Sequence, residues 1–288
     1  MAPELDRRAL LDDSSARGVA FCGLLSQRVD AWLARLWDAA GGPDKGAALV
    51  AVGGYGRAEL SPGSDIDVYL LYEPKVAVAE LAERVWYPIW DEGVKLGHAV
   101  RTVKETLALA SDDLDTATAI LSVRHLAGDK QLSDELSVKG LELWQKRSKR
   151  WLDEMDVRVR DRHKEAGEVA FLLEPDLKNG RGGLRDVHAI GWAELAGMSL
   201  LPGDHKAIAE AYEVVLSARV ELQRRTGRHS DILLLEEQDA VAAALGFGDA
   251  DVFMRALSTA ARTIAWVSDE LWFSVRSSLD GPTRRKLR

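Results

Sequence analysis

Short apolar runs alternate with longer stretches of helical spacing over the first 130 residues. Each run is apolar or alternating and is bounded by Gly or Pro, a pattern that predicts a β-strand. The three predicted strands are AALVAV at 47–52, IDVYLLY at 66–72 and VKLGHAVR at 94–101. Helical spacing covers residues 5–40, 75–92 and 103–127. This part of the chain is therefore expected to mix strands with helices.

Beyond this region the strand pattern disappears. Residues 134–165 are long, charged and helix-like, residues 171–186 are irregular and rich in Gly, and the remainder has helical periodicity. Within 205–226 one helical face collects Ile208, Tyr212, Val215 and Leu222. The fold class predicted is α+β. Its expected divisions are an N-terminal helical segment over 1–44, a mixed domain over 45–130 and an all-α domain over 131–288.

Composition narrows the possible partners and the compartment. The chain has 288 residues, 47% of them hydrophobic, which is enough for one catalytic domain and a second helical domain. Its formal net charge of −8 disfavours long nucleic acid as a partner. One cysteine, no signal-like N-terminus and no run of about 18 apolar residues favour a cytoplasmic protein without a membrane span.

The candidate chemistry lies in VAVGGYGRAELSPGSDIDVYLLY. Asp65 and Asp67 stand at positions i and i+2 of a strand, so their side chains share one face while Ile66 points into the core. Two carboxylates so close repel each other unless a divalent cation lies between them. Mg²⁺ accepts oxygen ligands and keeps coordination positions for phosphate oxygens. The pair is therefore a candidate metal site, although an isolated pair of this kind is more often a solvated strand end.

A glycine turn precedes the acidic pair. Gly53 and Gly54 follow a strand, and small residues there let backbone N–H groups approach a phosphate closely. Arg57 adds a positive charge beside them. Because ten residues separate Gly54 from Asp65, the turn and the acids can meet at one end of the sheet. Together they suit nucleotidyl or phosphoryl transfer.

At these residues the sequence resembles the polymerase β nucleotidyltransferase superfamily, whose signature is a glycine turn followed by Asp-hydrophobic-Asp. GGYGRAELSPGSDIDVYLL is more narrowly similar to the N-terminal region of the bifunctional uridylyltransferase/uridylyl-removing enzymes, which modify the PII nitrogen-signalling protein. Further similar segments occur in the same order, over roughly residues 45–275. They are LGHAVRT at 96–102, SDDLDTATAILSVRHLAGD at 111–129, LEPDLKNGRGGLRDVHAIGW at 173–192 and DILLLEEQDAVAAALG at 231–246.

The resemblance implies a polymerase β-like domain with a small mixed sheet, followed by a helical domain. It implies transfer of UMP from UTP, or of AMP from ATP as in the actinobacterial branch, to a tyrosine hydroxyl of PII. Mg²⁺ or Mn²⁺ would be the cofactor. By the same resemblance, Asp65 and Asp67 are catalytic and hold the metal. The nucleotide-binding residues would be Gly53, Gly54, Arg57 and Ser64.

The sequence departs from the family in two respects. Polymerase β relatives often add a third acid from the next strand, but VKLGHAVR contains none; Asp113, Asp115 and Glu92 are the alternatives. Full-length family members also carry a phosphohydrolase domain and sensor domains, yet none of the six histidines here is followed by Asp. The chain is therefore expected to be a transferase fragment or a member without those domains.

Three features allow two interpretations each. The segment EPDLKNGRGGLRD at 174–186 either closes over a substrate or is a structural connector whose glycines turn the chain. His98 either touches the nucleotide or is a hydrogen-bonded strand spacer. Arg219 interrupts the apolar stripe of 205–226, and it either pairs with a buried acid or extends its charge to solvent, the commoner case.

Two other functions remain open. The missing third acid is also consistent with a non-catalytic module that binds a nucleotide or PII. Alternatively, the chain is a nucleotidyltransferase with another acceptor, such as a tRNA end, an antibiotic or glutamine synthetase. The excess of acidic over basic residues disfavours tRNA as the acceptor.

Overall fold

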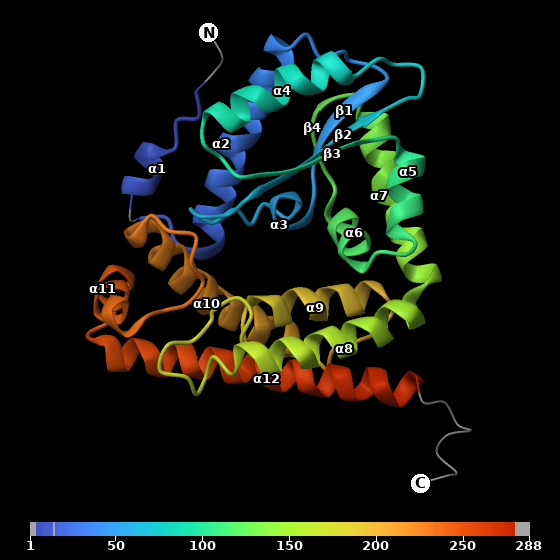
Figure 1. Ribbon diagram of the computed structural model, residues 1–288. Coiled ribbons are helices and arrows are strands. Elements are labelled where there is room, and N and C mark those ends of the chain that lie inside the picture. The colour runs from blue at the N-terminus through green and yellow to red at the C-terminus, as the bar shows by residue number, and fades with distance from the viewer. Residues whose placement is uncertain (1–3, 14, 280–288) are drawn as a thin grey trace. The chain divides into compact units, whose positions relative to one another are not determined.

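A mixed sheet lies within residues 47–128 of the computed structural model, which describes residues 4–13 and 15–279 (Figure 1). Its strands are β1 Ala47–Ala51, β2 Ile66–Tyr72, β3 Leu96–Arg101 and β4 Arg124–Gly128. Their order is β3-β2-β1-β4. β1 runs antiparallel to β2 and β4, whereas β3 runs parallel to β2. The predicted α+β class with a small mixed sheet is therefore confirmed.

Burial explains the pattern of the two central strands. All five residues of β1 are buried, because β2 and β4 pair with its two edges and the helices at 53–56 and 130–146 pack against it. Along β2, Ile66, Val68 and Leu70 are buried, whereas Asp67 and Tyr69 are only partly covered. One face of β2 therefore belongs to the core, and the other carries polar side chains.

The strand β4 was not expected, since residues 103–127 were predicted to be helical. Helices α5 Val103–Ala110 and α6 Leu114–Ala119 and the 3₁₀ turn η1 Ile120–Ser122 occupy most of that stretch, but the chain then extends and pairs with β1. All five residues of β4 are partly exposed, as is usual at a sheet edge. Its strand state comes from long-range pairing, so the local pattern does not reveal it.

Helices cover the sheet and form the core of the first part of the chain. They are α1 Arg8–Asp12, α2 Gly18–Ala39, α3 Gly53–Gly56, α4 Ala79–Asp91 and α7 Lys130–Lys146, together with α5 and α6. The largest fully buried side chains here include Trp32, Trp37 and Trp144. Thr102 begins α5 with a capping box. Its hydroxyl accepts from the Glu105 N–H, and the Glu105 carboxylate accepts from the Thr102 N–H.

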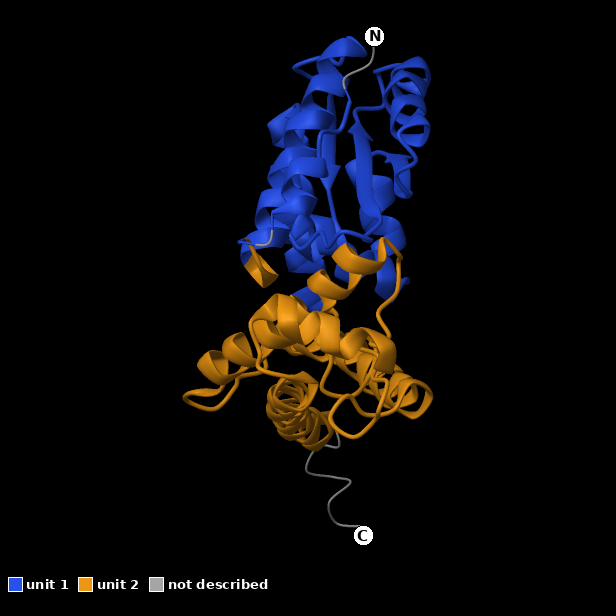
Figure 2. Ribbon diagram, turned by 90° about the vertical axis from the view of Figure 1, so that its left-hand side faces the viewer, with its two compact units in different colours: residues 1–15, 20–146 blue, residues 16–19, 147–288 orange. Residues whose placement is uncertain are grey.

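The chain divides into two units, coloured blue and orange in Figure 2. Unit 1 comprises residues 1–15 and 20–146, and unit 2 comprises 16–19 and 147–288. The predicted helical domain began at residue 131, but α7 belongs to unit 1 because it packs against α5, η1, β1 and β4. The helix-like stretch 134–165 is correspondingly interrupted, at Arg147.

Unit 2 is helical, as predicted. Its helices are α8 Ser148–Ala166, α9 Leu184–Leu195, α10 Asp204–Thr226, α11 Leu235–Leu245 and α12 Ala250–Leu279. The long helix α12 contacts the other four and carries much of the core, including Phe253, Leu257 and Ile264. The segment between α8 and α9 is irregular, also as predicted. Across the described residues of both units, no helix is long and apolar enough to cross a membrane.

Candidate active site

Asp65 and Asp67 stand where β2 begins. Asp65 is exposed and directly precedes the strand, and Asp67 is partly covered. Between them Ile66 is 3% exposed and belongs to the core, so alternation directs the two acids to the other face. The Ile66 N–H donates to the Lys95 carbonyl at 2.9 Å, which fixes the start of β2 against β3.

Two glycines flank the Asp67 carboxylate. Gly97 is the register partner of Asp67 on β3, and a Cβ atom built there would lie 2.2 Å from Asp67 Oδ1. A Cβ atom at Gly53 would lie 3.5 Å from Asp67 Oδ2. The carboxylate therefore occupies space that a side chain on β3 would fill. Sequence reasoning missed Gly97, although a glycine inside a predicted strand is a signal of close approach.

The glycine turn lies beside this carboxylate. Gly53 starts the short helix α3 with a φ of 59°, a conformation that favours glycine. The Val52 N–H donates to the Asp67 carbonyl at 3.0 Å, which ties the residue before the turn to β2. The structure thus brings Gly53 and Asp67 together, as two of the six predicted site residues.

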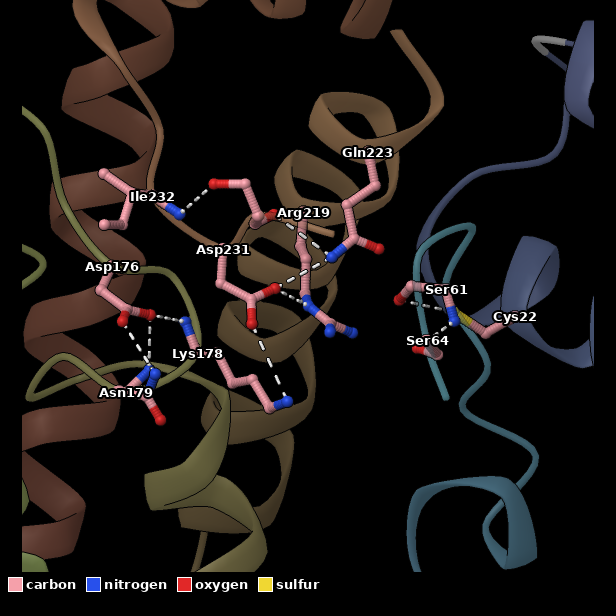
Figure 3. Close-up of polar contacts among 11 residues, drawn as sticks. Cys22, Ser61, Ser64, Asp176, Lys178, Asn179, Arg219, Gln223, Asp231 and Ile232 are labelled. Carbon is pink, nitrogen blue, oxygen red and sulfur yellow. Dashed lines mark hydrogen bonds and ion pairs between the residues drawn. The ribbon is translucent and has the colours of Figure 1, made fainter. Parts of the chain in front are cut away.

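Arg57 and Ser64 bond within their own loops. Arg57 ends α3, and its Nε donates to Glu59 Oε2 at 2.7 Å, with both side chains about one quarter exposed. A Cβ atom at Gly54 would lie 3.8 Å from Arg57 Nη2, so the guanidinium borders the turn. The Ser64 hydroxyl accepts from the Ser61 N–H at 3.0 Å and stabilises the loop before β2 (Figure 3).

The face of β2 that carries Asp67 also carries Tyr69, whose surroundings are charged. Burial raises the pKa of Tyr69, Arg101 opposes this, and the negative charges of Asp67 and Asp113 raise it further. The negative charges of Asp113 and Asp67 thus both affect the pKa of the same tyrosine. It also caps α6, accepting from the Thr116 N–H at 2.8 Å.

A third acid for the site stays a prediction. Glu92 follows the last residue of α4, and Asp115 lies in the first turn of α6. Within residues 4–13 and 15–279, no group of three or more His, Cys, Asp or Glu side chains could hold a metal ion. Metal binding by the pair Asp65 and Asp67 likewise stays a prediction.

His98 lies on the other face of the sheet from Asp67. It pairs with Val68, and its ring packs 5.5 Å from Trp86 and 5.6 Å from Trp90 of α4, measured between ring centroids. An aromatic contact, rather than the expected hydrogen bond, holds the ring. The geometry gives no support to a nucleotide contact by His98.

In unit 2, the segment 174–186 has the features of a structural connector. Asp176 Oδ1 accepts from the N–H groups of Lys178 and Asn179 at 2.9 and 2.8 Å, which forms a turn (Figure 3). The Leu177 N–H donates to the Asp231 carbonyl at 2.8 Å and continues a short pairing with the segment before α11. Closure of this segment over a substrate stays a prediction.

The same segment is fastened to α12 and to the chain just after α8. A Cβ atom at Gly182, where φ is 82°, would lie 2.3 Å from the Ala261 carbonyl oxygen of α12. Arg181 pairs with Glu168 at 2.5 Å and also with Asp269 of α12. Three glycines of the segment are therefore required by close backbone approach, since Gly180 and Gly183 also lack room for a Cβ atom.

Asp186 is a fully buried carboxylate in the first turn of α9. It accepts from the Gly182 N–H at 2.7 Å, Arg162 Nη2 at 2.6 Å and His163 Nε2 at 2.8 Å. Burial alone would raise the pKa of Asp186, but the His163 hydrogen bond, the charges of Arg162 and His163 and the Gly182 N–H outweigh it and hold the pKa below its ordinary value.

Arg219 forms an ion pair with an acid, Asp231, as one of the two interpretations of the sequence held, but this acid is only partly buried. Its Nε donates to Asp231 Oδ1 at 2.6 Å, and Arg219 is 6% exposed (Figure 3). The same oxygen accepts from Gln223 Nε2 at 2.9 Å, and Lys178 Nζ lies 3.8 Å from the other oxygen. The alternative of a solvent-directed arginine is wrong.

Comparison with known proteins gives one consistent result. Residues 150–272 match the family described as GlnD PII-uridylyltransferase. The chain is 42% identical over 271 residues to a protein of Streptomyces coelicolor named bifunctional uridylyltransferase/uridylyl-removing enzyme, covering 93% of the chain and 32% of that protein. Proteins of the same name from Mycobacterium tuberculosis and Caulobacter vibrioides are 42% and 33% identical, each over 82% of the chain and over 30% and 28% of their own lengths. The chain thus spans about a third of the length of these relatives.

Proposed function

Through residues 150–272 the chain belongs to the GlnD PII-uridylyltransferase family, and we propose that it is a nucleotidyltransferase acting on the PII protein. It would transfer UMP from UTP, or AMP from ATP, to a tyrosine hydroxyl and release pyrophosphate. The observation that carries this proposal is the Asp67 carboxylate, held beside the Gly53 turn at the exposed start of β2.

The side chains present suit this chemistry. Asp65 and Asp67 would hold Mg²⁺ or Mn²⁺, which neutralises charge on the triphosphate and on the leaving pyrophosphate when bound. Gly53 and Gly54 leave their backbone accessible because no Cβ covers it. Arg57 places a positive charge at the end of the same turn, where its contact with Glu59 holds the guanidinium.

The proposed transfer is a single displacement at the α-phosphorus. The tyrosine oxygen forms a bond to the α-phosphorus, and the bond from that phosphorus to the bridging oxygen of the β-phosphate breaks. The tyrosine proton passes to a carboxylate, and the exposed Asp65 is the more accessible of the pair. The protein contributes mainly position and charge neutralisation.

Substitution of the two acids tests the proposal. The purified chain is incubated with Mg²⁺, PII and each of the four labelled NTPs, and label on PII is measured. Asp65→Asn and Asp67→Asn should lower the rate by roughly 10²- to 10³-fold, the loss expected when several kcal/mol of charge stabilisation disappear. Asp91→Asn, an exposed change at the end of α4, is the matched control. Labelling that persists in Asp67→Asn with unchanged melting temperature would contradict the proposal.

One observation favours a second candidate function. The residue opposite Asp67 on the neighbouring parallel strand is Gly97, so that strand supplies no third acid. A module that binds a nucleotide or PII without turnover would share this geometry. It would bind UTP or ATP in the presence of Mg²⁺ or Mn²⁺ but transfer no label to PII. A nucleotidyltransferase with another acceptor would instead release pyrophosphate only when that acceptor replaced PII.

A further inference from the structure

The guanidinium of Arg124 binds the backbone of the glycine turn. Arg124 is the first residue of β4 and pairs with Ala51, at the end of β1. Its Nη2 donates to the Tyr55 carbonyl at 2.8 Å, and its Nε donates to the Gly56 carbonyl at 3.3 Å. One side chain therefore holds two successive carbonyls of α3, on a strand that the sequence pattern did not predict.

Asp30 and the ring of Tyr55 hold this guanidinium in place. Asp30 of α2 forms an ion pair with Arg124 Nη1 and accepts the Tyr55 hydroxyl at 2.6 Å. The guanidinium carbon lies 5.0 Å from the centroid of the Tyr55 ring, so the arginine also stacks on the residue whose carbonyl it binds. Burial, and then the charge of Asp30, raise the pKa of Tyr55, which keeps its hydroxyl protonated as a donor.

The far end of the turn has no freedom to shift. A Cβ atom at Gly56 would lie 1.6 Å from the Ser122 carbonyl oxygen, so the turn is packed directly against the chain that leads into β4. At its near end, Gly53 borders Asp67. The contacts of Arg124, Asp30 and Tyr55 therefore determine where Gly53 and Gly54 stand relative to the Asp67 carboxylate.

We propose that Asp30, Tyr55 and Arg124 form a positioning network that holds the glycine turn in the conformation that receives the nucleotide. The proposal rests on the proposed function. Arg124 acts through the backbone of the turn, and it is not a catalytic residue. Arginine suits this position because three separate nitrogens of its planar fork reach two carbonyls and a carboxylate, whereas the donors of a lysine ammonium all diverge from one nitrogen.

Arg124→Lys tests the network while keeping the charge next to Asp30. Arg28→Lys is the matched control, because Arg28 is on the same helix as Asp30 and donates to the Asp6 carbonyl at 3.0 Å, away from the turn. Three quantities are measured for each purified protein. They are the melting temperature, the amide hydrogen exchange of residues 52–58 without nucleotide, and the Kd for UTP and ATP with Mg²⁺.

The positioning role predicts a distinct pattern in Arg124→Lys. Exchange in residues 52–58 should rise about tenfold and the Kd for the nucleotide should rise about tenfold, as expected from the loss of one or two charge-assisted hydrogen bonds. The melting temperature should fall by only a few degrees. Tyr55→Phe removes the hydroxyl that bonds Asp30 but keeps the Arg124 contacts with the two carbonyls, so it should show a smaller change in the same two quantities.

The outcomes separate the two proposals. If exchange at 52–58 or the Kd in Arg124→Lys equals that of Arg28→Lys, the positioning role is overturned and the proposed function stands. If the melting temperature falls while the Kd of the folded protein is unchanged, Arg124 is merely structural, and the positioning role is again overturned. If the unsubstituted protein binds neither UTP nor ATP, the proposed function fails and the positioning role fails with it.

Discussion

Gly97→Ala tests how the Asp67 carboxylate is held. The new Cβ would stand 2.2 Å from Asp67 Oδ1 and 3.4 Å from Asp67 Cγ. Ordinary contact begins at 3.4 Å, so the oxygen must retreat by about 1.2 Å, which requires the Asp67 side chain to rotate. The backbone of Gly97 has no positive φ, so alanine itself is not strained there.

The expected magnitudes separate activity from stability. A misplacement of about 1 Å at a reacting group costs roughly 10²-fold in rate, or about 2.7 kcal/mol of activation free energy. The free energy of unfolding should fall by only about 1 kcal/mol, because overpacking costs roughly 1–3 kcal/mol and the loss of a flexible glycine returns about 0.4–1 kcal/mol. The assay is nucleotide transfer to PII, read beside urea unfolding of the same preparations.

A second glycine provides the control. Gly23 lies within α2 and has no atom within 4 Å of a built Cβ, so Gly23→Ala should leave transfer unchanged and stabilise the helix by roughly 0.5–1 kcal/mol. Gly97→Ala with transfer within twofold of the unsubstituted protein would refute the claim that this glycine makes room for Asp67. Equal losses of transfer and folded protein would refute it too.

Two further changes probe unit 2. Because the pKa of Asp186 is depressed in the folded state, its contribution to stability is complete above the unfolded value of about 3.9 and is lost as the pH falls through the lower folded value. Asp186→Asn should therefore cost roughly 3–5 kcal/mol at pH 7 and flatten the decline of stability below pH 4 in urea titrations; an unchanged pH profile would count against this. Gly182→Ala should cost roughly 2–4 kcal/mol, because strain at a φ of 82° adds to the clash with Ala261. Gly197→Ala, at a φ of 97° in open space, should cost about 1–2 kcal/mol, and equal costs would show that the clash is unimportant.

Features set by local pattern were predictable from the sequence. The alternation in IDVYLLY directs Asp67 away from Ile66, and it identified both the strand and the face that carries Asp67. The glycines of the turn were recognisable because they follow a strand directly. The helical character of unit 2 followed from the 3.6-residue period, whose buried members Ile208, Val215 and Leu222 lie on α10.

Features set by distant partners were not predictable. Arg124 lies in a strand only because β1 offers an edge for pairing, and RHLAG alone has no alternation that would indicate this. The reason for Gly97 is a carboxylate thirty positions earlier in the chain. For Arg219 both interpretations were considered, but the partner Asp231 becomes visible only when the loop before α11 is placed.

The contacts of Gly182 and Arg181 with α12 have a consequence for the order of folding during translation. Residues 167–186 leave the ribosome well before Ala261 and Asp269, the partners on α12 against which they pack. A connector rich in glycine has little structure of its own. It can therefore adopt its folded conformation only after about eighty more residues, including its partners on α12, have been synthesised. Unit 2 should therefore acquire protease resistance late in translation and in one step, when α12 emerges. Nascent chains stalled before that helix would expose the connector to cleavage.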